Sequence, residues 1–273
     1  MATALVTGGT SGIGAEFARQ LAARGTDLVL VARDADRLAA TAADLESGYG
    51  IRVETISADL ALPADVARVA ARLEDASRPV DILINNAGFG VHLPLTSTDT
   101  AKHELAIDVM IRAVLVLGGV AARSMRARGS GRILNVASVA GLITMGAYSA
   151  IKAWVVSYGQ GLSVELRGTG VTVTTLLPGW VRTEFHERAG IGTSSIPGSL
   201  WIESDALVRS AIRDLDRGRA LSIPSVRFKT LSWFAQRLPR STVRWISGRI
   251  SSARRAESGH GSEHPAVDER TGG

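Results

Sequence analysis

Short apolar runs and longer amphipathic stretches alternate along most of this 273-residue chain. Residues 28–31, Leu-Val-Leu-Val, are fully apolar, which is typical of a strand buried on both faces of a parallel sheet. Strand and helix patterns that alternate in this way predict an α/β fold with a doubly wound parallel sheet. The predicted strands are 4–6, 28–31, 52–57, 82–85, 132–137 and 171–177, and the predicted helices are 15–24, 36–46, 63–75, 100–127, 150–168 and 204–216.

A glycine-rich segment joins the first predicted strand to the first helix. Residues 7–14 are Thr-Gly-Gly-Thr-Ser-Gly-Ile-Gly. Gly8 permits a tight turn, Gly12 lets a pyrophosphate approach the backbone, and Gly14 lets the helix pack closely on the strand. The free N–H groups at the start of the helix also attract phosphate. The segment predicts a dinucleotide site, the alternative being a turn without a ligand, and its expected contacts are Gly8, Thr10, Ser11, Gly12, Ile13 and Gly14.

The end of the second predicted strand bears on which dinucleotide would bind. An NAD site places an acid there, about 20 residues beyond the glycine loop, to hold the ribose diol. Here the strand ends at Ala32 and Arg33. Alanine cannot bind a diol, whereas a guanidinium suits the 2′-phosphate of NADP. Arg33 therefore predicts NADP(H), although the adjacent Asp34 opposes an anion, and the alternative is that Arg33 is an ordinary solvated loop residue.

Three further motifs follow the glycine loop in chain order. Residues 85–88 are Asn-Asn-Ala-Gly, residues 148–152 are Tyr-Ser-Ala-Ile-Lys, and residues 178–183 are Pro-Gly-Trp-Val-Arg-Thr. With the glycine loop, these motifs resemble the short-chain dehydrogenase/reductase family over about residues 3–215. The resemblance implies a Rossmann fold, a nicotinamide cofactor, and interconversion of a carbonyl and an alcohol.

Tyr148 and Lys152 suit the chemistry of carbonyl reduction. Hydride addition to a ketone builds negative charge on its oxygen, so a nearby group must donate a proton. Lys152 lies one helical turn from Tyr148 on the same face, and we expect its ammonium to lower the tyrosine pKa from about 10. The resemblance implies that Tyr148 is the acid/base, that Lys152 also binds the nicotinamide ribose, and that Ser138 bonds the substrate carbonyl. The alternative for Tyr148 and Lys152 is an ordinary i,i+4 helix pair.

The resemblance also implies the remaining cofactor contacts. Asp59 and Leu60, after the third predicted strand, are expected beside the adenine. The residues expected at the ribose and at the nicotinamide end are Asn86, Ala87, Gly88, Pro178, Val181 and Thr183.

Two departures from the family pattern concern the catalytic residues. Tyr148 follows Ser138 by ten positions, against about twelve or thirteen in the family, which predicts a shorter loop across the substrate mouth. The family's catalytic asparagine aligns with Met110, which has no amide to orient a water. Either the proton relay is carried differently, or the chain has drifted toward a non-catalytic role. The joint presence of Ser138, Tyr148 and Lys152 favours an active enzyme.

Composition excludes several kinds of site. The chain has no cysteine, which excludes disulfides, thiolate nucleophiles and cysteine-based metal sites. Its five histidines lack metal-ligand spacing, so we expect no metal. We find no run of about 18 apolar residues that predicts a spanning helix and no export signal at the N-terminus. These features favour a cytoplasmic protein.

The net charge of +5 is concentrated near the C-terminus. Residues 217–255 contain ten Arg and Lys residues and no acid, interleaved with aromatic and aliphatic residues at helical spacing. Basic amphipathic helices favour peripheral contact of residues 225–255 with the inner membrane face. The alternative is that they pack on the body or on a sister subunit. No known nucleic-acid-binding module is visible, so we expect no nucleic acid.

The predicted organisation is a Rossmann domain (1–216), a basic helical extension (217–255) and a disordered tail (256–273). A lid is expected at 184–204, and its apolar residues either favour a lipophilic substrate, such as an acyl chain, long-chain ketone or steroid-like ring, or pack the lid on the body. The sequence predicts an NADP(H)-dependent enzyme that interconverts a ketone and a secondary alcohol, and the resemblance implies a homo-oligomer. The alternative is a catalytically weak or inactive cofactor-binding regulator or a membrane-associated scaffold.

Overall fold

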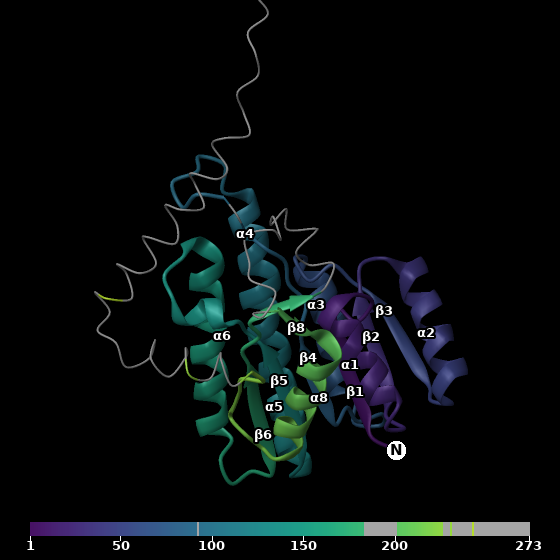
Figure 1. The fold of residues 1–273 in the computed structure, drawn as a ribbon. Coiled ribbons are helices and arrows are strands. Elements are labelled where there is room, and N and C mark those ends of the chain that lie inside the picture. The colour runs from purple at the N-terminus through teal and green to yellow at the C-terminus, as the bar shows by residue number, and fades with distance from the viewer. Residues whose placement is uncertain (92, 183–200, 226–229, 231–241, 243–273) are drawn as a thin grey trace, which may run out of the picture.

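The computed structural model describes residues 1–91, 93–182, 201–225, 230 and 242. Its centre is a seven-stranded sheet in which every paired strand runs parallel, with helices on both faces (Figure 1). The predicted doubly wound α/β fold is therefore confirmed. In spatial order the strands are β3 (Val53–Ser57), β2 (Asp27–Ala32), β1 (Thr3–Thr7), β4 (Ile82–Asn85), β5 (Gly131–Val136), β6 (Val171–Leu176) and β9 (Leu221–Ser222).

The helices form two layers around the sheet because successive strand residues point to opposite faces. Along β1, Ala4 and Val6 enter the core cluster shared with one helix layer, whereas Leu5 enters the cluster on the other face. The first layer contains α1 (Gly12–Ala22), α2 (Ala35–Tyr49) and α8 (Ser204–Asp216), and the second contains α3 (Pro63–Glu74), α5 (Ala113–Arg128) and α6 (Gly146–Glu165).

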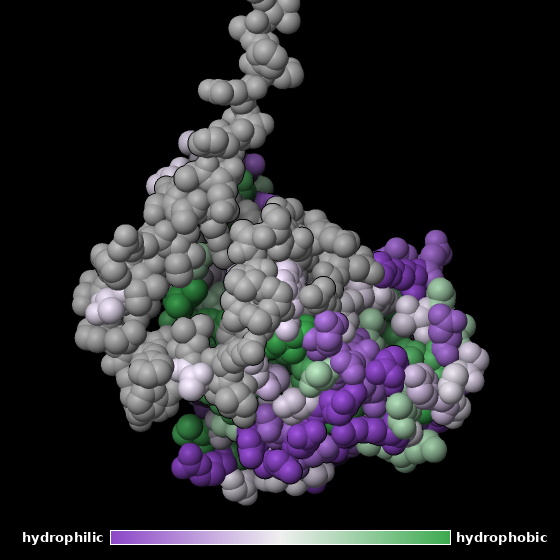
Figure 2. Space-filling view, in the orientation of Figure 1, coloured by the Kyte–Doolittle hydropathy of each residue, from purple (hydrophilic) through white to green (hydrophobic). Residues whose placement is uncertain are grey.

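Helix α8 shows how an amphipathic pattern fixes the orientation of an element. Leu207, Ile212 and Leu215 are buried in the core, while Arg209 and Arg213 are exposed. In the space-filling view, hydrophilic residues gather over the face where α8 and α1 lie (Figure 2). The apolar side of the helix thus faces the sheet and the charged side faces water.

Several boundaries differ from those predicted. Strand β9 pairs with β6, so the sheet extends past residue 216, where we predicted the Rossmann domain to end. Two three-residue strands that the sequence analysis missed, β7 (Trp180–Arg182) and β8 (Trp201–Glu203), pair with each other in parallel. Helix α6 begins at Gly146, four residues earlier than predicted, so Tyr148 lies inside it.

The predicted helix 100–127 is interrupted. It is divided into α4 (Ala101–Ile107), a π-helical turn η1 (Asp108–Arg112) and α5. Contrary to our expectation, the stretch Ala101–Arg128 is long and apolar enough to cross a membrane, but half of its most apolar window is buried within the protein. Its residues Leu117 and Met125 belong to the core cluster on the α5 face of the sheet.

Some predictions fall on residues that the structure does not describe. Thr183, most of the predicted lid at 184–204, most of the extension at 217–255 and the tail at 256–273 lie outside the described residues. The membrane contact predicted for 225–255 stays a prediction for the same reason.

Candidate active site

The candidate site lies where the order of strands reverses, between β1 and β4. In open parallel sheets, ligands bind in the crevice beyond the carboxyl ends of the strands at such a point. The glycine loop follows β1, residues 86–88 follow β4, and Ser138 follows β5 with one intervening residue. The topology therefore brings the predicted motifs to one edge of the sheet.

The glycine loop has the geometry that its sequence predicts. Gly8 and Gly12 have φ of 66° and 54°, which L-residues with side chains rarely adopt. At Gly14, an added Cβ would collide with the Gly8 carbonyl and the Asn86 amide, so this position has no room for a side chain. Ser11 precedes α1 without a side-chain cap, which leaves the first N–H groups of the helix available to an anion.

Asn86 is engaged inside the protein. Its Nδ2 donates to the carbonyl oxygen of Thr7 at 2.9 Å and to that of Gly8 at 3.3 Å. The Thr7 hydroxyl in turn accepts the backbone N–H groups of Asn86 and Ala87 at 2.9 and 3.0 Å. The side chain of Asn86 therefore holds the two loops together, and Thr7, which the motif analysis did not single out, is its partner.

The predicted adenine end combines one buried and two accessible residues. The Leu60 side chain is buried in the core, so any contact of Leu60 with a ligand would come from its backbone. Asp59 is partly buried, and its Oδ1 accepts the Ala61 N–H at 3.0 Å. Arg33 is exposed, and no ion pair among the described residues engages its guanidinium. The Asp34 carboxylate accepts the Arg37 N–H at 3.0 Å and thereby caps α2.

Ser138, Tyr148 and Lys152 are brought together as predicted. The Tyr148 hydroxyl hydrogen-bonds with Ser138. The Lys152 Nζ lies 5.7 Å from the centre of the Tyr148 ring and donates to the Val136 carbonyl at 2.9 Å. Lys152 is only 4% exposed. The group therefore combines a proton donor, a hydrogen-bonding hydroxyl and a buried cation.

Burial controls the pKa values of this group. Desolvation raises the pKa of Tyr148 to about 12, an effect that its hydrogen bond with Ser138 partly opposes. Desolvation lowers the pKa of Lys152 to about 8. Only the hydrogen bond with Ser138 lowers the Tyr148 pKa in the described structure, so the lowering that we expected from Lys152 stays a prediction.

The short segment between Ser138 and Tyr148 packs directly on α6. It forms one 3-10 turn, η2 (Val139–Leu142), for which the Ser138 Oγ accepts the Ala140 N–H at 3.1 Å. A Cβ at Gly141 would lie 2.7 Å from the Lys152 carbonyl carbon. The absence of a side chain at Gly141 thus lets the Ser138 segment approach the part of α6 that carries Lys152.

The Met110 side chain is buried close to Lys152. It lies in the π-turn η1, is 1% exposed, and packs with Ala147 and Ile151 of α6. A Cβ added to Gly88 would lie 3.0 Å from the Met110 Sδ and 3.7 Å from the Lys152 Nζ. The structure therefore places a thioether at the position where the resemblance implies an asparagine.

The segment after β6 borders the same crevice. The Pro178 carbonyl accepts the Val139 N–H at 3.0 Å, which joins this segment to the Ser138 turn. The Val181 side chain is 3% exposed and belongs to the core, and its backbone pairs with Ile202. Any contact of Val181 with a nicotinamide amide would therefore come from its backbone.

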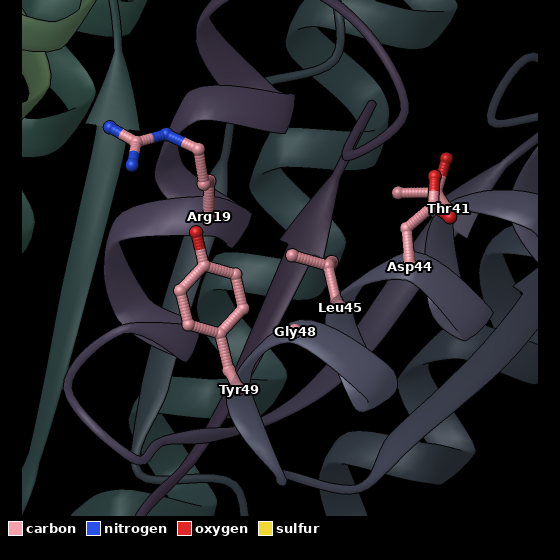
Figure 3. Close-up of a pocket in the computed structure, with 6 residues that line it drawn as sticks. All are labelled: Arg19, Thr41, Asp44, Leu45, Gly48 and Tyr49. Atoms are coloured by element: carbon pink, nitrogen blue, oxygen red, sulfur yellow. The ribbon is translucent and has the colours of Figure 1, made fainter.

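A separate hollow of about 490 Å³ lies between α1 and α2 (Figure 3). The Tyr49 hydroxyl points toward Arg19 across it and hydrogen-bonds with that side chain. None of the predicted site residues lines this hollow. The chemistry of Ser138, Tyr148 and Lys152, rather than the size of a depression, identifies the candidate site.

The described residues fit a phosphorylated dinucleotide. The glycine positions clear the backbone beside an uncapped helix N-terminus, and an exposed arginine follows β2. The groups that would hold such a cofactor are the backbone of Gly12, Ile13 and Gly14, together with Arg33, Asp59 and Lys152.

Comparisons with known proteins agree with this geometry. A very-long-chain 3-oxoacyl-CoA reductase of Anas platyrhynchos is 32% identical over 70% of this chain and 68% of its own. A short-chain dehydrogenase from Sphingobium yanoikuyae, solved in complex with NADPH, is 35% identical over 99% of both chains, with a TM-score of 0.78. The alcohol dehydrogenase of Comamonas testosteroni that is specific for bulky-bulky ketones is 29% identical over 99% of this chain and 97% of its own, with a TM-score of 0.74. The short chain dehydrogenase family model matches residues 2–191, and the chain is an oxidoreductase that belongs to this family.

Proposed function

We propose that the chain is an NADPH-dependent reductase that converts the ketone of a lipophilic substrate to a secondary alcohol. The observation that carries this proposal is the joint placement of Ser138, Tyr148 and Lys152 beside the glycine loop. The relatives support it, because one solved structure holds NADPH, one acts on bulky ketones and one relative reduces 3-oxoacyl chains.

The proposed chemistry divides the work between cofactor and protein. NADPH, when bound, supplies a hydride to the carbonyl carbon. Tyr148 donates its phenolic proton to the carbonyl oxygen, and its pKa of about 12 keeps that proton in place near neutral pH. Ser138, which already hydrogen-bonds with Tyr148, holds the same oxygen. Lys152 keeps one donor on Val136 and offers its remaining N–H groups to the ribose hydroxyls and to the charge that forms on Tyr148.

Arg33 supports the choice of NADPH over NADH. Its guanidinium is exposed at the end of β2, where a 2′-phosphate would bind. The Asp34 carboxylate accepts the Arg37 N–H and caps α2, and no ion pair between Asp34 and Arg33 is present among the described residues. A charge-assisted hydrogen bond to phosphate is therefore open to Arg33.

The surroundings of Ser138 support a lipophilic substrate. Val139, Leu142, Trp154 and Trp180 are partly buried and pack around one small core cluster on this side of the site. Substrate pockets are usually lined by apolar and aromatic side chains, with a few polar groups that fix orientation. A ketone with bulky or extended apolar substituents matches such a lining.

A non-catalytic cofactor-binding role is the second candidate, and Met110 favours it. The thioether beside Lys152 has no amide and cannot orient a water as asparagine does. In this role the chain would bind NADPH without turnover.

One experiment separates the two candidates. NADPH oxidation is measured with a panel of long-chain, bulky aryl and steroid-like ketones, for the wild type and for Tyr148→Phe, while NADPH binding is followed by fluorescence. The reductase proposal expects turnover by the wild type and loss of turnover in Tyr148→Phe with binding retained. A wild type that binds NADPH but reduces none of the ketones would favour the regulator.

A further inference from the structure

Arg112 connects the π-helical turn η1 to the loop after β3, which is expected beside the adenine. Its Nη2 donates to the Ala61 carbonyl at 2.6 Å and lies 3.2 Å from the Asp108 Oδ1. Ala61 directly follows Asp59 and Leu60, the pair expected beside the adenine. A side chain from the π-turn η1 therefore bonds to the backbone of a loop 51 positions earlier in the chain.

The loop after β3 is held at several points. The Asp59 N–H donates to the Asp65 Oδ2 at 2.7 Å, and the Ala61 N–H donates to the Asp59 Oδ1 at 3.0 Å. The first bond ties the β3–α3 connection to the first turn of α3, and the second lies within the connection. Arg112 adds a bond from a different element, so the positions of this loop and of η1 depend on each other.

A second residue of η1, Met110, lies close to Lys152. Met110, two residues before Arg112, packs against Gly88 and lies in the apolar cluster with Ala147, Ile151 and Tyr148. A π-turn has i→i+5 hydrogen bonds in place of the α-helical i→i+4 bonds, and such turns occur frequently at functional sites. The same five-residue turn thus contacts the loop at residues 59–61 through Arg112 and the surroundings of Tyr148 and Lys152 through Met110.

We propose that Arg112 is a positioning residue that couples the adenine half of the cofactor site to the nicotinamide half. The proposal rests on the proposed function for the identity of the cofactor. An adenosine group that contacts residues 59–61 would fix the position of the Ala61 carbonyl. Through its hydrogen bond to that carbonyl, Arg112 would then be fixed together with the π-turn. The position of Met110 beside Lys152 would follow from that of the turn. Because binding at the two halves favours one arrangement of η1, each half strengthens the binding of the other.

The two halves of NADPH can be supplied separately to test this coupling. The probes are reduced nicotinamide mononucleotide and adenosine 2′,5′-bisphosphate. The dissociation constant of the mononucleotide is measured by fluorescence with and without saturating bisphosphate. In the wild type we expect the bisphosphate to tighten mononucleotide binding by about five- to tenfold.

Three variants test whether Arg112 is responsible for this coupling. In Arg112→Met, which keeps an apolar stem but removes the guanidinium, the ratio of the two dissociation constants is expected to fall to about one. Arg112→Lys retains a donor and is expected to keep part of the effect. Arg123→Met is the matched control, because Arg123 is an exposed arginine of α5 that lies 3.6 Å from Glu74, and it is expected to keep the wild-type ratio.

A wild-type ratio of one, or an unchanged ratio in Arg112→Met, would overturn the proposal. Thermal unfolding of each variant confirms that the comparison is between folded proteins. The measurement uses binding alone, so it is independent of turnover. A wild type that couples the two halves but oxidises no NADPH would refute the proposed reaction and leave the role of Arg112 standing.

Discussion

Gly141 gives the sharpest mutational test of how the site is held. Its Cα faces the backbone of α6, and a Cβ there would lie 2.7 Å from the Lys152 carbonyl carbon and 2.8 Å from the Ala153 nitrogen and the Lys152 oxygen. Ordinary contact between carbon atoms is about 3.5–4.0 Å, so the overlap with the Lys152 carbonyl carbon is at least about 0.8 Å. The atoms that it meets are backbone and cannot rotate away. Gly141→Ala must therefore displace the 3-10 turn or α6.

The cost of that displacement can be stated in two measurable quantities. Overpacking in a well-packed region typically destabilises a protein by about 1–3 kcal/mol. Ser138 caps this turn and hydrogen-bonds with Tyr148, so a shift of about 1 Å should lower kcat by about 100-fold. We expect Gly141→Ala to show both effects, the first in urea unfolding and the second in steady-state reduction of a bulky ketone.

Gly161 of α6, the helix against which Gly141 packs, supplies the matched control. Nothing lies within 4 Å of a Cβ added there, and α6 continues on both sides of it. Gly161→Ala should therefore leave kcat unchanged and stabilise the protein by about 0.5–1 kcal/mol through helix propensity. If Gly141→Ala matched this control in both stability and kcat, the packing argument for the Ser138 turn would be refuted.

Three further predictions concern the cofactor site and the buried lysine. Gly14→Ala should abolish NADPH binding, measured by fluorescence, because its Cβ would collide with the Gly8 carbonyl and the Asn86 amide; retained affinity would contradict the loop geometry. Arg33→Ala should lower kcat/KM for NADPH by about 10- to 100-fold, the value of a charge-assisted hydrogen bond, and should change kcat/KM for NADH far less; equal losses would contradict phosphate recognition. Burial lowers the Lys152 pKa from 10.5 to about 8, so between these pH values the unfolded chain binds a proton that the folded chain does not, and the free energy of unfolding should rise with pH by about 3 kcal/mol. Urea melts should show that Lys152→Met flattens this rise, and an equal rise in the variant would assign it to another group.

The alternation of strands and helices was sufficient to predict the parallel sheet and its two helix layers. Fully apolar runs such as 28–31 became β2, because only a strand buried on both faces needs apolar residues at every position. The strand β9 escaped detection, since two residues carry no period. Ser222 in this strand is buried and donates to the Asp214 Oδ2 at 2.7 Å, a tertiary contact that no local pattern encodes.

The proximity of the candidate catalytic residues was predictable for a different reason. The four-residue spacing of Tyr148 and Lys152 fixes their common face on a helix, and Ser138 follows a recognisable strand. Their electrostatic environment depends on burial by distant segments. The sequence analysis accordingly missed that Lys152 bonds to the Val136 carbonyl and that desolvation dominates the pKa of Tyr148.

Side-chain roles in the cofactor loops were likewise set by tertiary contacts. That Asn86 lies close to the ribose stays a prediction, and the sequence analysis missed that its amide spans the loops after β1 and β4. The sequence analysis also missed the π-turn around Met110, which contacts α6, whereas α5 beyond it packs on α3.

Hydride transfer itself can be measured most directly with NADPH deuterated at C4 of the nicotinamide. Wild-type protein and Tyr148→Phe are each incubated with this cofactor and a bulky ketone, and the product is examined by mass spectrometry. The account predicts a secondary alcohol that carries one deuterium at the carbinol carbon with the wild type, and no such product with Tyr148→Phe. A wild type that binds NADPH but forms no deuterated alcohol, or a Tyr148→Phe variant that forms it at the wild-type rate, would contradict the account.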